Sequence, residues 1–166
     1  MILMDLNEQV DWDFSRALRK AQPRRLVLRL RGRPTSCSVS HSFDEVRNSL
    51  RAHNRVRRGI MVVDPDKIVG SVGRSEDFDQ CFMPLRASVG ERWKQVDLAF
   101  YREKVLPPVS LYKLGDAYFV LDGNNRVSVA RYHGVLAVDA EVTEFCPARV
   151  ERGNARDAAG PKTRAA

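Results

Sequence analysis

Tyr118-Phe119-Val120-Leu121-Asp122-Gly123-Asn124-Asn125-Arg126-Val127 decides the fold, because this stretch joins an expected strand to an expected helix. Residues 118–121 are β-branched, aromatic or aliphatic and predict a strand. The residues from Val127 to Tyr132 predict a short helix, which Gly134 would end as a C-cap signal. A helix that begins at such a turn presents free backbone N–H groups and the positive end of its dipole.

Arg126 lies in the first turn of the expected helix. Its guanidinium offers a planar set of donors that suits phosphate or carboxylate. The turn therefore predicts an anion site, and the alternative is an ordinary Asp-Gly turn whose arginine is only solvated. The sequence contains no Walker-type phosphate loop, so any phosphate binding would depend on this turn.

The segments around the turn follow an order that resembles the ParB/sulfiredoxin superfamily. They are residues 64–74 (the family's first box), 106–112, Gly115-Asp116, 118–131, Gly134 and 138–142. The resemblance covers about residues 60–146 and implies an α/β (α+β) fold, with a small mixed sheet flanked by helices. Members of this superfamily bind a nucleotide, ATP or CTP according to subfamily, and their Gly-x-x-Arg turn holds the phosphates.

The resemblance also implies which residues form the site. Gly123, Asn124, Asn125 and Arg126 would hold phosphate. Arg74, at the end of the first box, would reach the same pocket. The implied ligands are ATP or CTP together with Mg²⁺.

Asp122 is the candidate for catalysis and for metal binding. It is a carboxylate beside the expected phosphate site, which suits it to hold Mg²⁺ or to orient a nucleophile. The alternative is a turn residue whose carboxylate accepts a hydrogen bond from the following backbone.

Several departures from the superfamily limit the activities that the resemblance implies. Sulfiredoxins carry a reactive cysteine directly after the turn glycine, where this chain has Asn124, so sulfinic acid reduction is not expected. Kinase-like members have a histidine pair in the turn. The Asn124-Asn125 pair can form hydrogen bonds but cannot transfer protons near neutral pH. Chromosome-partitioning ParB proteins have Glu-Arg-Arg after the glycine and a helix-turn-helix region downstream, for which residues 147–166 are too short.

Positive charge is concentrated in the N-terminal part of the chain. Residues 14–60 carry thirteen Lys or Arg and two acidic residues, whereas residues 61–146 carry ten basic and thirteen acidic residues. A segment of this density would attract DNA phosphate or an anionic membrane surface without sequence preference. The alternative is a solvated, arginine-rich face. Phe14 and Phe43 are the only aromatic residues in the segment, which does not favour base stacking.

The chain is expected to have three parts. These are a basic helical extension over residues 1–58, a ParB/sulfiredoxin-like domain over residues 59–146 and a disordered basic tail over residues 147–166. In the extension, apolar residues from Leu6 to Ala21 recur at helical spacing and predict a helix that ends before Pro23.

The spacing of polar and apolar residues predicts the elements that follow. They are a helix or strand at 24–31, a helix from the Ser42/Glu45 capping box to about His53, a strand at 59–63, a loop-rich region at 70–90 and a helix at 91–105. Phe78, Phe82 and Met83 are expected to attach the loop-rich region to the core.

Cysteine and histidine are sparse. Cys37, Cys81 and Cys146 are odd in number and widely spaced, which predicts free thiols and supports neither a disulfide framework nor a zinc site. The three histidines lack the spacing typical of metal ligands, and His133 beside Gly134 predicts a helix C-cap. With no long apolar run and no signal-peptide pattern, a cytoplasmic protein is expected.

Three functions remain open on these observations. The first, which the turn, the first box and the basic segment favour, is a regulatory nucleotide-binding domain. Its ligand would control association with DNA, as in chromosome partitioning or transcription regulation, or with a partner protein or a second copy. The second is a nucleotide hydrolase or small-molecule phosphotransferase that uses Asp122. The third is a ligand-free scaffold that binds a partner.

Overall fold

The expected strand–turn–helix unit lies at the centre of the protein. In the computed structural model, which describes residues 5–30 (main chain only for 22–30), 43–73 and 76–147, β4 (Ala117–Asp122) leads through Gly123 into α4 (Asn124–Tyr132). Gly134 has a φ of +68°, the left-handed conformation that commonly follows a helix end. The strand, the turn and the glycine stop are therefore confirmed.

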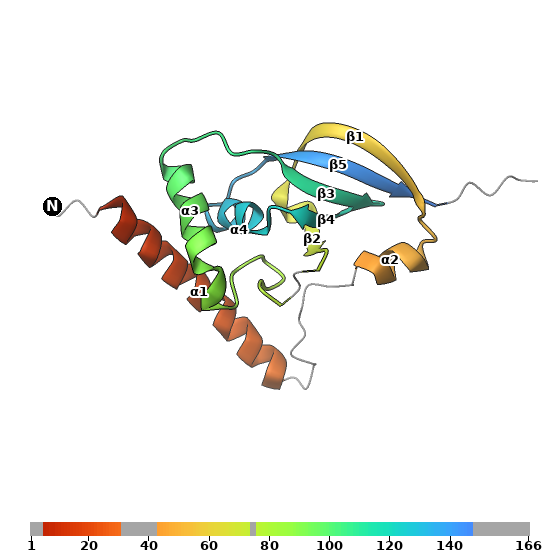
Figure 1. The fold of residues 1–166 in the computed structure, drawn as a ribbon. Helices are drawn as coiled ribbons and strands as arrows, with labels where there is room; N and C mark the ends of the chain where they lie inside the picture. Colours follow the sequence, from red (N-terminus) through yellow and green to blue (C-terminus); the bar gives the residue numbers. More distant parts are fainter. Residues whose placement is uncertain (1–4, 31–42, 74–75, 148–166) are drawn as a thin grey trace, which may run out of the picture.

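The sheet contains five strands, and both parallel and antiparallel pairs occur in it. Its strands are β1 (Asn54–Val63), β2 (Ile68–Ser71), β3 (Val109–Leu114), β4 and β5 (Val138–Cys146), in the spatial order β1-β5-β3-β4-β2. The β1–β5 and β3–β4 pairs are antiparallel, whereas β3–β5 and β2–β4 are parallel. The described residues also form four α-helices and two short 3-10 helices, η1 (Pro65–Lys67) and η2 (Ala87–Val89). Together with the sheet they confirm the expected mixed α+β architecture (Figure 1).

A larger core lies between the sheet and three helices, α1 (Leu6–Leu30), α3 (Gly90–Tyr101) and α4. Trp93 of α3 is fully buried at its centre. Its ring lies 5.6 Å from that of Phe14 on α1, and its indole Nε1 donates to Ser128 Oγ of α4 at 2.8 Å. Figure 1 shows α1 crossing α3, with α4 on the other side of α3.

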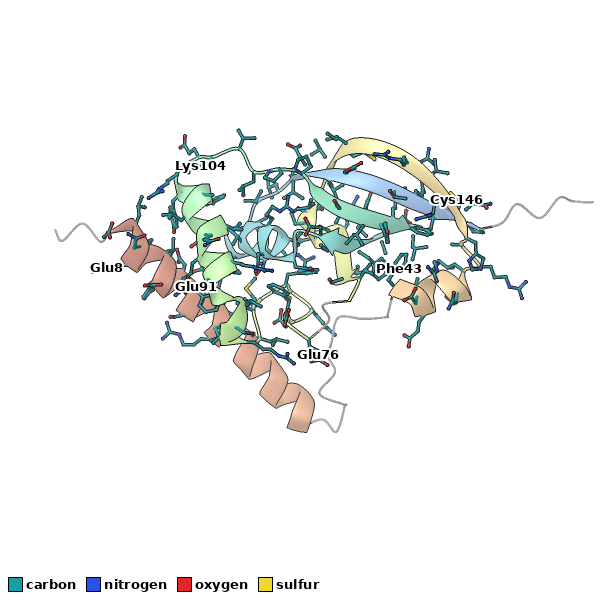
Figure 2. All side chains as sticks on the ribbon, in the orientation of Figure 1. Glu8, Phe43, Glu76, Glu91, Lys104 and Cys146 are labelled. Atoms are coloured by element: carbon teal, nitrogen blue, oxygen red, sulfur yellow. The ribbon has the colours of Figure 1, made fainter. Side chains whose placement is uncertain are left out.

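A smaller core lies under α2 (Phe43–Ser49) on the other face of the sheet. Phe43 packs edge-on against Phe119 of β4 and Phe145 of β5, with ring centroids 5.6 and 5.2 Å apart. Figure 2 labels Phe43 at the start of α2, beside the sheet. Phe119 belongs to this core while its neighbour Val120 belongs to the larger one, because successive side chains of a strand point to opposite faces.

The N-terminal helix is longer than expected. It was predicted to end before Pro23, but α1 continues to Leu30. The φ of proline, about −65°, is compatible with a helix, although an interior proline removes one backbone donor and crowds the preceding turn. Residues 24–30, which the sequence left open between helix and strand, are helical.

Two other helices are shorter than expected. The helix predicted to reach His53 ends at Ser49, and the helix predicted over residues 91–105 ends at Tyr101. Each is followed by a non-glycine residue with positive φ, Arg51 at 49° and Glu103 at 51°. The amide next to each of these residues donates back over the helix end, from Ala52 to the carbonyl of Arg47 and from Lys104 to that of Ala99.

The N-terminal part packs closely on the rest of the chain. β1 begins at Asn54, inside the range expected for the extension, and pairs along its length with β5. Phe78, Phe82 and Met83 are buried in the larger core, as predicted for the loop-rich region. The predicted tail from residue 148 onward, the predicted loop at 32–36 and the N-cap Ser42 lie outside the described residues.

Candidate functional site

The site is built on the N-terminus of α4. Gly123 occupies the N-cap position with a φ of +103°, and its carbonyl accepts the first helical hydrogen bond from Val127 N–H at 3.0 Å. The amides of Asn124, Asn125 and Arg126 precede that bond, so they have no acceptor within the helix. Their N–H groups and the helix dipole together favour an anion at this end.

An open cleft of about 400 Å³ lies at this helix end, and we call it the α4 cleft. It is lined by Arg92, Gln95, Val96, Leu106, Leu121, Asp122, Gly123, Asn124, Asn125 and Arg126. The five site residues predicted in the turn therefore meet at one cavity. The sixth, Arg74, lies outside the described residues.

The guanidinium of Arg126 is already partly engaged by the protein. Its Nη1 donates to the carbonyl oxygens of Pro107 and Pro108, and its Nη2 donates to Asp122 Oδ2 at 2.6 Å. An arginine has five N–H donors, so two N–H groups remain beyond these three bonds. Arg126 is thus held rigidly at the wall of the cleft, with its charge partly balanced by Asp122.

Gly123 is required at its position for two reasons. A φ of +103° is unfavourable for residues with a side chain. A Cβ at this position would lie 2.8 Å from Val109 Cγ1 and 3.1 Å from both Cζ and Nε of Arg126. The missing side chain therefore lets the side chain of Arg126 approach the turn closely.

The asparagine pair carries unsatisfied acceptors. Asn124 is 7% exposed, and the buried Oδ1 atoms of Asn124 and Asn125 have no hydrogen-bond partner among the described residues. A buried polar atom without a partner costs roughly 1–3 kcal/mol. Both residues line the α4 cleft.

Arg92 and Gln95 of α3 were not predicted as site residues. They lie one helical turn apart on α3 and face the N-terminus of α4 across the cleft. Arg92 is exposed and forms no ion pair within the part of the chain that the structure describes, so its charge is available to an anion. Only the packing of α3 on α4 brings this arginine to the site.

A smaller, mostly apolar cavity of about 150 Å³ shares Val96, Leu106 and Arg126 with the α4 cleft. Its other lining residues include Phe100, Val109, Val129 and Val138. A polar cleft and an apolar cavity that share a wall suit a ligand with one charged and one apolar part.

The basic segment is partly neutralised where it enters the sheet. Arg57 and Arg58 of β1 pair with Glu141 and Glu144 of β5, both at 2.6 Å. Glu144 also accepts from Lys113 of β3 at 3.2 Å, and these donors hold the pKa of Glu144 below its ordinary value. These pairs favour the alternative of a solvated ionic face for this part of the segment.

Two further expectations concern the cysteines and the membrane. Cys81 and Cys146 are free thiols, as predicted, while Cys37 lies outside the described residues. Among the helices of the described part, none has the length and hydrophobicity of a transmembrane segment.

Comparison with known proteins gave one distant structural likeness. The fold is similar to the crystal structure of sulfiredoxin from Arabidopsis thaliana, with 14% sequence identity over 50% of this chain and 82% of that chain, at a TM-score of 0.37. No protein-family model and no curated protein matches the sequence.

Proposed function

We propose that the α4 cleft binds a nucleotide, ATP or CTP, and that the bound nucleotide regulates association with DNA or a partner protein. The observation that carries the proposal is the convergence of the α4 N-terminus, the rigid Arg126 and the available Arg92 on one open cavity. Phosphate groups suit this combination of main-chain donors and guanidinium groups. The adjoining apolar cavity suits the flat base.

The α4 cleft offers one carboxylate, that of Asp122, as a ligand for Mg²⁺. Proteins usually hold Mg²⁺ through one or two carboxylates together with substrate phosphates and water. Asp122, whose side chain is 76% exposed at the cleft, would supply that carboxylate. Asp122 now accepts from Arg126, so a carboxylate that turns to Mg²⁺ would leave Nη2 of Arg126 for phosphate.

Calorimetric titration of the full chain with ATP, CTP and GTP, with and without Mg²⁺, tests the proposal. Arg92→Gln should weaken nucleotide binding about tenfold or more, because a hydrogen bond to a charged group contributes roughly 1.5–3 kcal/mol. Arg19→Gln, an exposed arginine of α1 away from the cleft, is the matched control. Absence of heat with every nucleotide at millimolar concentration, or equal affinities of all three proteins, would refute nucleotide binding in this cleft.

The proposed DNA contact uses residues 14–60 and needs a separate measurement. Fluorescence anisotropy with a labelled duplex, at several salt concentrations, should show a steep loss of affinity as salt rises, because arginine contacts release counterions from the phosphates. Adding the nucleotide that binds the α4 cleft should change the DNA affinity. If the affinity for DNA is the same with and without that nucleotide, the regulatory part of the proposal fails.

A further inference from the structure

Three side chains of metal-ligating type meet where α1, α3 and α4 join. Asp13 comes from α1, Asp97 from α3 and His133 from the C-cap of α4, and one ligand atom of each lies within 4.8 Å of the others. Asp13 is 3% exposed and Asp97 is fully buried. His133 Nε2 and Asp97 Oδ1 are 2.6 Å apart. This cluster is separate from the α4 cleft, whose lining includes none of the three residues.

The cluster has more negative charge than it can neutralise itself. Two buried carboxylates face one imidazole, so the group remains anionic whether the ring is neutral or protonated when both acids are ionised. Asp97 Oδ2 is buried and has no hydrogen-bond partner among the described residues. Burying a carboxylate with one oxygen unsatisfied is costly. A divalent cation with two carboxylates and a neutral imidazole would make the group neutral.

Three basic side chains of α1 and α3 have partners other than these carboxylates. Lys94 pairs with Asp11 at 2.7 Å, Lys20 lies over the ring of Tyr132 and Arg16 over the ring of Trp12. In each of these contacts the cation lies against a group other than the two buried acids.

The side chains of the cluster are held in place by their surroundings. Tyr132 donates to Asp13 Oδ1 at 2.6 Å, while Tyr101, at 2.6 Å, and Gln9, at 3.1 Å, donate to Oδ2. The imidazole of His133 is stacked on Phe100 with ring centroids 4.2 Å apart. Hydrogen bonds of this kind orient the ligands in metal sites, and each typically changes metal affinity 10–100-fold.

We propose that Asp13, Asp97 and His133 bind a divalent transition metal ion of the Zn²⁺ type. A ligand set of one imidazole and two carboxylates suits Zn²⁺ better than Mg²⁺, which prefers oxygen ligands alone. Zinc bonds of about 2.0–2.2 Å place tetrahedral ligands about 3.4 Å apart. The ion would therefore replace the 2.6 Å contact between His133 Nε2 and Asp97 Oδ1 and hold these two atoms farther apart. The partly exposed His133 gives access to the site.

The proposed ion would connect α1 to α3 and α4. The three ligands are far apart in the sequence, at positions 13, 97 and 133, so no local spacing reveals them. Metal binding would therefore stabilise the docked position of α1, whether or not the α4 cleft binds a nucleotide.

Equilibrium dialysis of the metal-stripped full chain against Zn²⁺, with metal analysis of the protein, tests the site. A variant with all three cysteines replaced by serine removes competing thiols. This protein should retain one Zn²⁺ per chain. His133→Gln and Asp97→Asn should lose it, and Tyr132→Phe should bind about 10–100-fold more weakly. His53→Gln and Asp116→Asn, which change exposed residues away from the cluster, are the matched controls.

Co²⁺ provides a second, spectroscopic readout. Its visible absorption should show a nitrogen and oxygen ligand set without thiolate charge transfer, and the spectrum should disappear in His133→Gln. Zn²⁺ should also slow amide hydrogen exchange in α1. Lack of stoichiometric Zn²⁺ in the cysteine-free protein overturns the proposal, as does binding that persists in both His133→Gln and Asp97→Asn. If Asp97→Asn does not fold, His133→Gln alone decides.

Discussion

Asp122 Oδ2 accepts a hydrogen bond from Arg126 Nη2 at 2.6 Å, so the turn's carboxylate and its cation neutralise each other across four residues. Asp122 is mostly exposed while Arg126 is 16% exposed and bonded to two backbone carbonyls. The arginine is therefore the fixed partner, and the carboxylate is the one that is free to turn away.

Asp122→Asn should separate two proposed roles of Asp122, which are pairing with Arg126 and binding Mg²⁺. Without Mg²⁺, the affinity for inorganic phosphate should rise about fivefold, because the change removes a repulsive charge and an exposed pair of about 1 kcal/mol. With Mg²⁺, the affinity for a nucleoside triphosphate should fall. Calorimetry measures both, with Asp116→Asn in the exposed hairpin as control. If Asp122→Asn and Asp116→Asn have the same affinities for phosphate and for the nucleotide, Asp122 does not take part in binding.

An assay of phosphate release tests the alternative that the protein is a nucleotide hydrolase. If Asp122 orients a nucleophile, Asp122→Asn should remove nucleotide hydrolysis by the purified protein, whereas Asp116→Asn should retain it. A rate that is the same in both variants would show that Asp122 has no catalytic role.

Gly123→Ala should destabilise the protein by about 2–4 kcal/mol, because it combines an unfavourable φ with a clash against Val109. Gly115→Ala is a matched control, since Gly115 also has a positive φ but has no atom within 4 Å of an added Cβ among the described residues. It should cost about 1 kcal/mol. Urea denaturation measures both. If both variants lose a similar free energy of unfolding, the structure relaxes the clash between the added Cβ and its neighbours.

Ser128→Ala should destabilise the protein by about 1–3 kcal/mol, because it leaves the buried indole N–H of Trp93 without an acceptor. Ser15→Ala on the exposed face of α1 should change the free energy of unfolding by less than about 0.5 kcal/mol. Urea denaturation again provides the comparison. An unchanged stability of Ser128→Ala would show that water or another group replaces the lost acceptor.

Protonation of Glu144 should lower the stability of the protein in acid. Hydrogen bonds from Arg58 and Lys113 lower its pKa from the ordinary 4.5. A lowered pKa in the folded state stabilises the protein above the unfolded pKa, and this contribution is lost as the pH falls through the folded pKa. Glu144→Gln should therefore show a smaller loss of stability below about pH 4.5 than the unmodified protein. Identical pH profiles would contradict this assignment.

The sequence contained clear signals for the central unit. The β-branched and aromatic residues of β4, the Asp-Gly turn and Gly134 after α4 are local features, and each acts within a few residues of its own position. The meeting of the five turn residues at the α4 cleft is also a local feature, because the N-terminus of a helix brings its own first residues together.

The ends of α2 and α3 had no such signal. Arg51 and Glu103 take the left-handed conformation that glycine usually occupies after a helix, so the sequence lacked the expected glycine. This conformation costs roughly 1–2 kcal/mol for other residues. At α2, burial of the adjacent Ala52 in the smaller core offsets that cost, and such burial depends on residues far away in the chain.

By itself, the sequence determined the strand–turn–helix unit and the free amides at its helix N-terminus, because short-range sterics and helix hydrogen bonding depend only on neighbouring residues. The tertiary structure alone decided that Arg92 faces the α4 cleft and that Asp13, Asp97 and His133 meet. These groups lie on different helices, and only the packing of α1 and α4 against Trp93 of α3 brings them within reach of one another.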